Sequence, residues 1–390
     1  MPDNLADPAF HANPHPSYAA WRRDGPIRRV RLASGTVAWL ITRYDDARRA
    51  LADPRFAKRA SDIRHPSNAI DRALSNHMLA VDPPDHTRLR RLVSAAFTAR
   101  RIEALRPRIS DITHELLDKF PADAPFDLID AFAFPLPIQV ICELLGIPAD
   151  DRDKFRRWSN IIVGGVAYQD KYPRAASAMV GYIQALVAAR RADPGDDLLS
   201  GLIGVRDSGD SLTEDELISM VFLLLIAGHE TTVNLIGNGM YLLLSQPDRW
   251  QRLCADPALI PTAIEEFLRY ESPVETATYR ITTEDIDFDG QTIPARSGVL
   301  IGLLSANRDG DRFPDPDAVE LDRAHNPHLA FGHGIHYCLG APLARLEAQI
   351  AFTALAASHK NLRLAVDESE LTWRPGLLLR GLFTLPVTPG

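Results

Sequence analysis

The chain has few cysteines and a small share of aromatic residues. Its 390 residues include three cysteines, and only 7% are aromatic. Cys142, Cys254 and Cys338 are widely spaced and odd in number, so a disulfide framework is not expected. This pattern favours a reducing compartment, and we expect a cytoplasmic protein. Cys142 lies in an apolar segment and is predicted to be a buried small hydrophobic residue.

Long hydrophobic runs are also missing. The longest, residues 220–227, is too short to cross a bilayer, and the polar, proline-rich N-terminal region does not resemble a signal peptide. We therefore expect no membrane segment. The hydrophobic fraction of 46% and the charged fraction of 24% are those of an ordinary globular protein.

The net charge of −8 argues against a nucleic-acid partner. Positive charge is nevertheless concentrated in residues 86–108. That segment contains Arg88, Arg90, Arg91, Arg100, Arg101, Arg106 and Arg108. The cluster is either a solvated helix face or a docking surface for an acidic electron carrier.

Helical patterns dominate, and strand patterns are confined to residues 27–44, 281–303 and the end of the chain from Leu362. No repeat or long linker divides the chain. We expect a mainly α protein with small β-sheets (α+β), in one domain over residues 1–390. The longest helix begins at the capping box Thr213 to Glu216 and continues to about Leu244, a length of about 45 Å.

A single cysteine stands on a glycine-rich loop at residues 331–340. Gly332, Gly334 and Gly340 permit backbone angles that side chains disfavour. Pro342 and the apolar spacing after it predict a helix that begins just beyond Cys338. A helix N-terminus lowers the pKa of a thiol, and a thiolate is a good ligand for a soft or borderline metal, haem iron included.

Polar residues interrupt the apolar pattern midway along the long helix, at residues 227–232. A buried polar cluster costs free energy unless it is hydrogen-bonded. One interpretation is a polar contact between helices. The other is a local opening of the helix that admits a small ligand beside a hydroxyl and a carboxylate.

These motifs resemble those of the cytochromes P-450, the haem-thiolate monooxygenases, and above all the soluble actinomycete-type bacterial members. The haem-loop pattern is matched at Phe331, Gly332, Gly334, His336, Cys338 and Gly340. The resemblance implies the cytochrome P-450 fold, a single large haem-binding domain with a long central helix. It also implies haem b as cofactor, with Cys338 as the axial ligand of the iron.

The resemblance implies roles for further residues. Ala227, Gly228, Glu230 and Thr231 match the family's central-helix element, in which the acid and the alcohol are catalytic and deliver protons to the oxygen being activated. The implied haem-propionate contacts are His86, Arg90, Arg280 and His336. The implied structural ion-pair network consists of Glu266, Arg269 and Arg323.

The substrate pocket is inferred by position in the family. The residues are Leu223, Leu224, Ala227, Val274, Thr278 and Leu378, together with the segments 60–80 and 158–168. They are mostly apolar or hydroxylated, so a lipophilic substrate with a few polar groups is expected.

The resemblance implies insertion of one oxygen atom from O2 into a C–H bond of a polyketide or macrolide, a terpenoid or a steroid of secondary metabolism. Electrons are expected from NAD(P)H through a ferredoxin reductase and a ferredoxin, and the protein is expected to be a monomer.

Two alternatives remain at this stage. One is a peroxide-driven haem-thiolate peroxygenase or a thiolate-haem isomerase, against which the intact Glu230–Thr231 pair argues. The other is a non-catalytic metal-binding protein, because the spacing of His328, His333, His336 and Cys338 is also compatible with structural zinc.

Overall fold

The computed structural model describes residues 3–59, 69–148, 151–163, 168, 170–207, 212–288 and 290–389. The chain forms two compact units. Unit 1 comprises Met1–Phe56, Arg106–Leu136 and Thr231–Gly390, and unit 2 comprises Ala57–Leu105 and Pro137–Glu230. The helix α12 (Glu214–Leu244) contributes to both units. A single domain over residues 1–390 stays a prediction.

The largest sheet has six strands in the order β1-β2-β3-β9-β6-β4. The strands are β1 (Asp3–Asn4), β2 (Ile27–Arg31), β3 (Val37–Ile41), β4 (Phe56–Ala57), β6 (Arg280–Thr282) and β9 (Gly298–Ile301). An antiparallel hairpin joins β2 to β3, and Gly35 in its turn has a φ of +82°. The strands predicted in residues 27–44 and 281–303 are confirmed.

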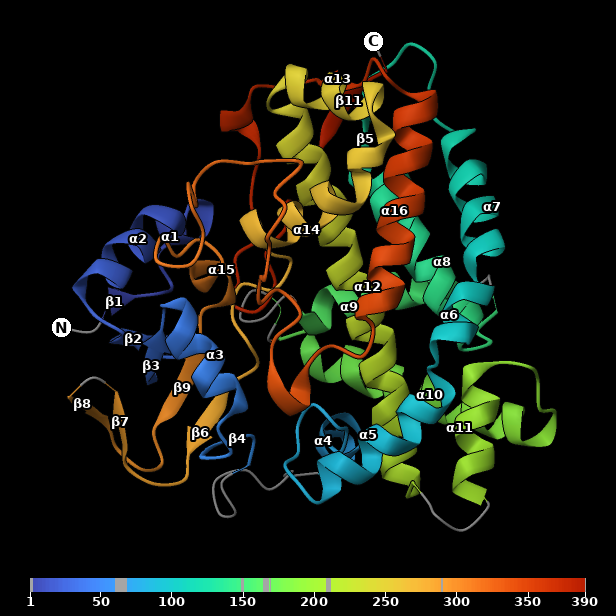
Figure 1. Ribbon diagram of the computed structural model, residues 1–390. Helices are drawn as coiled ribbons and strands as arrows, with labels where there is room; N and C mark the ends of the chain where they lie inside the picture. The colour runs from blue at the N-terminus through green and yellow to red at the C-terminus, as the bar shows by residue number, and fades with distance from the viewer. Residues whose placement is uncertain are drawn as a thin grey trace. The chain divides into compact units, whose positions relative to one another are not determined.

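Helices pack against both faces of this sheet. Because side chains alternate along a strand, Leu40 and Ile41 belong to different clusters. Leu40 packs with Phe10 of α1 (Pro8–Ala12) and with Tyr18 and Trp21 of α2 (His15–Asp24). Ile41 packs instead with residues of α3 (Tyr44–Ala52). Figure 1 shows α1, α2 and α3 beside the strands of this sheet.

Two smaller sheets complete the described strands. One has the order β10 (Arg363–Leu364), β11 (Pro386–Thr388), β5 (Phe126–Asp127), and the other is the hairpin of β7 (Ile286–Phe288) and β8 (Gln291–Ile293). The prediction that strands occur in only three regions of the sequence is wrong, because β1, β4 and β5 lie outside those regions. Each has two residues, too few to produce a periodic signal.

Unit 1 also contains helices from the later parts of the chain. They are α7 (Arg106–Leu117), α13 (Pro247–Ala255), α14 (Ile260–Tyr270), α15 (Leu303–Ala306) and α16 (Ala341–Ser358). Helix α16 packs against α7 and α14. A short π-helix at Ile129–Ala133 leads into α8 (Pro135–Leu144).

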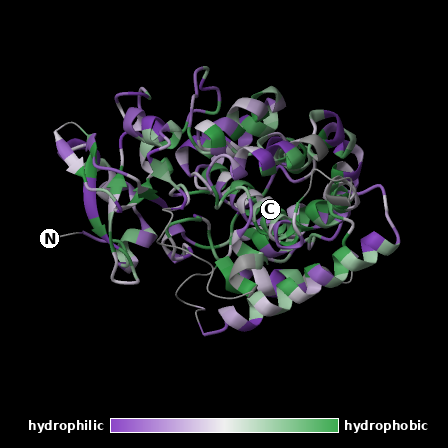
Figure 2. Ribbon diagram, turned by 90° about the horizontal axis from the view of Figure 1, so that it is seen from below, coloured by the Kyte–Doolittle hydropathy of each residue, from purple (hydrophilic) through white to green (hydrophobic). Residues whose placement is uncertain are grey.

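Unit 2 is almost entirely helical. Its helices are α4 (Ala69–Ser75), α5 (Asp85–Ala96), α6 (Ala99–Ala104), α9 (Arg152–Val163), α10 (Tyr172–Ala192) and α11 (Leu198–Asp207), with most of α8. Helix α10 packs against α9, α11 and α4. Hydrophilic and hydrophobic residues alternate along many helices (Figure 2), the pattern expected of amphipathic helices.

Helix α12 has the predicted start and end. The Thr213 N–H donates to Glu216 Oε2 at 2.8 Å, and the Glu216 N–H donates to Thr213 Oγ1 at 3.2 Å, so the capping box is confirmed. Among the described residues, α12 is also the one helix whose length and composition would suffice for a membrane span. However, 78% of its most apolar 18-residue stretch is buried inside the protein. The core helix of a globular protein gives the same result.

Candidate active site

The loop before α16 holds Cys338 in a fixed backbone conformation. Gly332 and Gly334 have φ angles of +73° and +74°, where a side chain is strained. A Cβ atom at Gly334 would also lie 2.9 Å from the Leu51 carbonyl oxygen. The Cys338 N–H donates to the Phe331 carbonyl at 2.9 Å, which closes the loop. The sequence motif therefore has a steric origin.

Cys338 differs from the two other cysteines in its surroundings. Its side chain is exposed, whereas Cys142 and Cys254 are buried. Burial raises the pKa of Cys254 to about 11, so that group stays a thiol at neutral pH. The predicted burial of Cys142 is confirmed at 0% exposure. Cys338 lies just before the N-terminus of α16, where the helix dipole favours a thiolate.

The donor at this loop fits a haem-thiolate site. A single accessible sulfur on a glycine loop is the donor type that haem iron takes from cysteine. The zinc alternative is wrong for the described residues, which include His328, His333, His336 and Cys338. They contain no group of three or more His, Cys, Asp or Glu side chains able to hold a metal ion.

Glu266, Arg269 and Arg323 form one buried ion-pair cluster. Arg269 donates to both carboxylate oxygens of Glu266 at 2.7 and 2.8 Å, and Arg323 Nε lies 3.0 Å from Oε2. Arg269 also donates to the carbonyls of Asn307, Pro316 and Ala318. The cluster thereby ties α14 to the chain segment that precedes the cysteine loop.

The polar residues of α12 lie next to α9. His229 Nδ1 is 2.6 Å from the Leu225 carbonyl, and its Nε2 is 3.1 Å from Ser159 Oγ and 3.3 Å from Glu230 Oε1. Glu230 is 1% exposed. In contrast, Ala227 is exposed and Thr231 is half-buried, so one side of the helix is accessible at this point. The catalytic roles of Glu230 and Thr231 stay predictions.

The four predicted propionate contacts fall in both units. His86 and Arg90 lie on α5 of unit 2, and His86 is buried. Arg280 begins β6 of unit 1, where it is 4% exposed and donates to the carbonyls of Phe56 and Leu51. His336 ends a 3₁₀ turn, Gly334–His336, in the cysteine loop. Their role toward a haem stays a prediction.

The predicted substrate-pocket residues lie in both units. Leu223 and Leu224 of α12 are 8% and 9% exposed. Val274 forms an isolated antiparallel bridge with Leu379, next to Leu378, which is 44% exposed. Thr278 is half-buried. Parts of the two predicted pocket segments, residues 60–68 and 164–167, lie outside the described residues.

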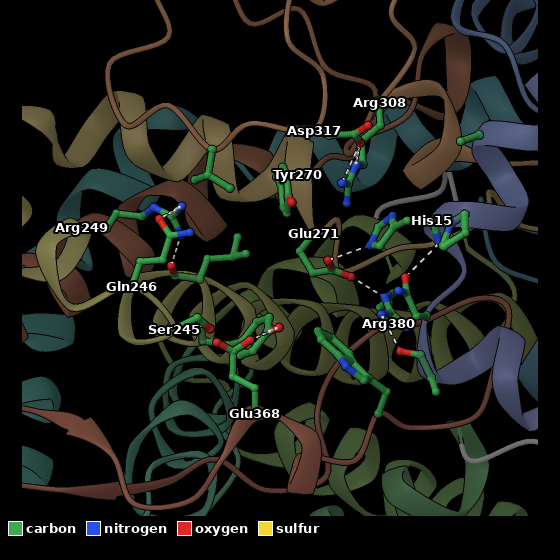
Figure 3. A pocket seen from close by; sticks show the side chains of 18 residues that line it. His15, Ser245, Gln246, Arg249, Tyr270, Glu271, Arg308, Asp317, Glu368 and Arg380 are labelled. Carbon is green, nitrogen blue, oxygen red and sulfur yellow. Dashed lines mark hydrogen bonds and ion pairs between the residues drawn. The ribbon is translucent and has the colours of Figure 1, made fainter.

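A cleft of about 560 Å³ in unit 1 contains none of the predicted site residues. His15 Nε2 lies 3.0 Å from Glu271 Oε2, and Arg380 donates to the other oxygen of the same carboxylate (Figure 3). The three groups satisfy one another. Burial lowers the pKa of His15 in spite of the Glu271 carboxylate, which raises it. This cluster binds the N-terminal helices to the C-terminal segment.

The arginine-rich segment 86–108 is partly neutralised. Arg88 pairs with Glu216 of α12, and Arg108 pairs with Glu115 at 3.1 Å. For these two residues the interpretation as a solvated, paired helix face is favoured over a free docking charge.

Sequence reasoning missed Glu265, and it considered His328 only as a zinc ligand. Glu265 adjoins Glu266 but points its carboxylate to different partners, His328 and Arg345. His328 and Arg345 lie 63 and 80 positions from Glu265, so no local sequence pattern joins the three residues.

Comparisons with known proteins agree with the loop geometry. The family model described as Cytochrome P450 matches residues 255–360. "Cytochrome P450 107B1" of Saccharopolyspora erythraea is 51% identical, over 100% of this chain and 98% of the relative. "Vitamin D(3) 25-hydroxylase" of Pseudonocardia autotrophica is 49% identical, over 99% and 96%. The solved structure of the tirandamycin C-bound P450 monooxygenase TamI has a TM-score of 0.93 and 48% identity, with both chains fully covered.

Proposed function

The chain belongs to the cytochrome P450 family and is an oxidoreductase of the monooxygenase type, and on that premise we propose that it hydroxylates a C–H bond of a lipophilic small molecule with one oxygen atom of O2. The observation that carries the proposal is the exposed Cys338 thiol, held at the start of α16 by the hydrogen bond of its N–H to Phe331. The family implies a haem-thiolate cofactor.

Haem b, held by the Cys338 thiolate, would supply the activation of O2. His86, Arg90, Arg280 and His336 would hold the propionates. Arginine and histidine suit this task because they donate charge-assisted hydrogen bonds to carboxylates.

Glu230 and Thr231 would move protons during the reaction. The Glu230 carboxyl is almost fully buried and lies 3.3 Å from the His229 ring, so a proton held there is shielded from bulk water. The Thr231 hydroxyl, on the next residue of α12 and half-buried, would pass a proton to the reacting oxygen. The intact acid–alcohol pair favours turnover with O2 over turnover with peroxide.

The substrate class follows from apolar residues and from the relatives. Leu223, Leu224 and Val274 would present an apolar surface to the substrate. One relative is named for vitamin D3 and one solved relative holds tirandamycin C. A polyketide or macrolide, a terpenoid or a steroid of secondary metabolism is the proposed substrate of this chain.

The electron donors would be a ferredoxin and its NAD(P)H-dependent reductase, with the enzyme acting as a cytoplasmic monomer. Ile335 and Tyr337 of the cysteine loop are 48% and 40% exposed, which supports a protein partner at this loop. In the 86–108 segment, Arg88 and Arg108 form ion pairs with Glu216 and Glu115 of this chain.

The spectrum of the reduced, carbon-monoxide-treated protein tests the proposal. The haem-loaded wild type should show a Soret band shifted far to the red, the signature of thiolate ligation. Cys338→Ser should lose this band, and Cys254→Ser is the matched control that should keep it. The absence of the shifted band in the wild type, or its loss in Cys254→Ser alone, would contradict the proposed function.

A further inference from the structure

Three ionisable side chains meet at the cysteine loop. Glu265 of α14 contacts Arg345 of α16 through two parallel hydrogen bonds, Oε1 to Nε at 2.6 Å and Oε2 to the terminal nitrogen at 2.7 Å. His328 Nε2 lies 3.0 Å from the same Oε2. We call Glu265, His328 and Arg345 the loop clamp. The loop clamp joins His328, which precedes the cysteine loop, to α16, which follows that loop.

The charge state of the loop clamp follows from its hydrogen bonds. The Ala330 N–H donates to His328 Nδ1 at 3.2 Å, so a neutral ring carries its proton on Nε2 and donates it to Glu265. Burial by itself would raise the pKa of Glu265, but the hydrogen bonds of Arg345 and His328 lower it to about 2. At neutral pH Glu265 is therefore a carboxylate paired with the Arg345 guanidinium.

The loop clamp reaches the cysteine through Phe331. The Arg345 guanidinium carbon lies 4.6 Å from the centroid of the Phe331 ring, a cation–π arrangement. The His328 ring is 6.0 Å from the same ring. The carbonyl of Phe331 accepts the hydrogen bond of the Cys338 N–H at 2.9 Å. The residue that Arg345 covers is thus the one that anchors Cys338.

The loop clamp is separate from the Glu266 cluster. Glu266 is fully buried and contacts Arg269 and Arg323, whereas the Glu265 side chain is 28% exposed and contacts α16. Because Glu265 and Glu266 are neighbours on one helix, their side chains point in different directions and support different segments.

We propose that Glu265 and Arg345 are positioning residues: their paired charges set the reduction potential of the iron bound to Cys338, and the contact of Arg345 with Phe331 keeps the loop in place. The inference depends on the proposed haem-thiolate function. A cation near the thiolate stabilises the form with the additional electron, and an anion destabilises it. Removal of each charge should therefore shift the potential in opposite directions.

Spectroelectrochemical titration of the haem-loaded protein tests this inference. Relative to the wild type, Arg345→Gln should lower the midpoint potential and Glu265→Gln should raise it, and the double variant should lie between them. Arg345→Lys keeps the charge but loses the bidentate contact. It should keep the wild-type potential while losing the red-shifted carbon-monoxide band faster on storage.

The matched control is Asp322→Asn, which removes one charge from an exposed pair in the same unit, 2.6 Å from Arg252. Its potential should equal that of the wild type. Potentials of Glu265→Gln and Arg345→Gln that are unchanged, or that shift in the same direction, overturn the inference and leave the haem-thiolate function standing. A wild type without the red-shifted band would instead refute the proposed function.

Discussion

At the residue scale, the chemistry of this enzyme depends on how single side chains are buried. Cys338 is exposed on its loop, whereas Glu230 is almost fully buried on α12. A ligand must be reached by the metal, and a proton donor works best where bulk water does not compete. The proposed ligand Cys338 and the proposed proton donor Glu230 therefore require opposite environments, which agrees with their exposure and burial.

The hydroxyl of Thr231 is the first group to test. Thr231→Ala should lower product formed per NAD(P)H consumed by about tenfold, because a positioned proton donor contributes at least that much. Product and cofactor are measured in the same reaction. Thr231→Ser keeps the hydroxyl and should remain coupled. Tight coupling in the alanine variant would remove Thr231 from the proton pathway.

Glu275 gives a pH-dependent prediction. Its Oε1 accepts from the Tyr18 hydroxyl at 2.7 Å, and burial raises its pKa to about 7 in spite of Arg380 nearby. A raised carboxyl pKa costs folding stability as pH rises from the unfolded value near 4.5 to about 7.

Glu275→Gln should therefore unfold at a higher temperature than the wild type at pH 8. The gain should be on the order of 1–3 kcal/mol and disappear near pH 5. Thermal melts at both pH values measure it. Glu284→Gln, at a side chain that is 60% exposed, is the control. A difference from the wild type that does not change with pH would show that Glu275 titrates normally.

At the scale of elements, close packing of α12 against its neighbours determines where glycine is required. A Cβ atom at Gly239 would lie 2.6 Å from Phe352 Cζ of α16 and 2.8 Å from Phe267 Cδ2 of α14. The helices approach here with no room for a methyl group. Glycine weakens a helix by itself, so its presence reflects this packing.

Gly239→Ala should destabilise the protein by about 1–3 kcal/mol, because the two phenylalanine rings must move apart. Gly181→Ala, on an exposed face of α10 where a Cβ meets nothing within 4 Å, should stabilise by about 0.5–1 kcal/mol. Urea unfolding of both variants measures the difference. Equal effects would mean that α12 has space at Gly239.

At the scale of the whole molecule, buried ion pairs connect distant parts of unit 1. The Glu266 cluster joins residues 57 positions apart, and the Glu271–Arg380 pair joins residues 109 positions apart. Each charge is buried, so loss of one partner leaves the other uncompensated.

Glu266→Gln should lower the free energy of unfolding by about 3–5 kcal/mol and reduce haem retention, because Arg269 and Arg323 lose their shared counter-ion. Glu320→Gln removes a 43% exposed carboxylate that is 3.3 Å from the same Arg323, and it should cost less than about 1 kcal/mol. Denaturation curves and haem content report both effects. Equal losses in the two variants would show that burial of the cluster is unimportant.

The sequence by itself determined the features whose signals are local. The glycines and cysteine of residues 331–340, the Thr213–Glu216 capping box and the hairpin at 27–44 each depend on neighbours a few positions away, and dihedral limits and periodicity made them visible. Tertiary structure decided the loop clamp, the His15–Glu271–Arg380 cluster and the two-residue strands. Their partners are far apart in the sequence, 256 positions for His15 and Glu271, and only the folded chain brings such groups within hydrogen-bond distance.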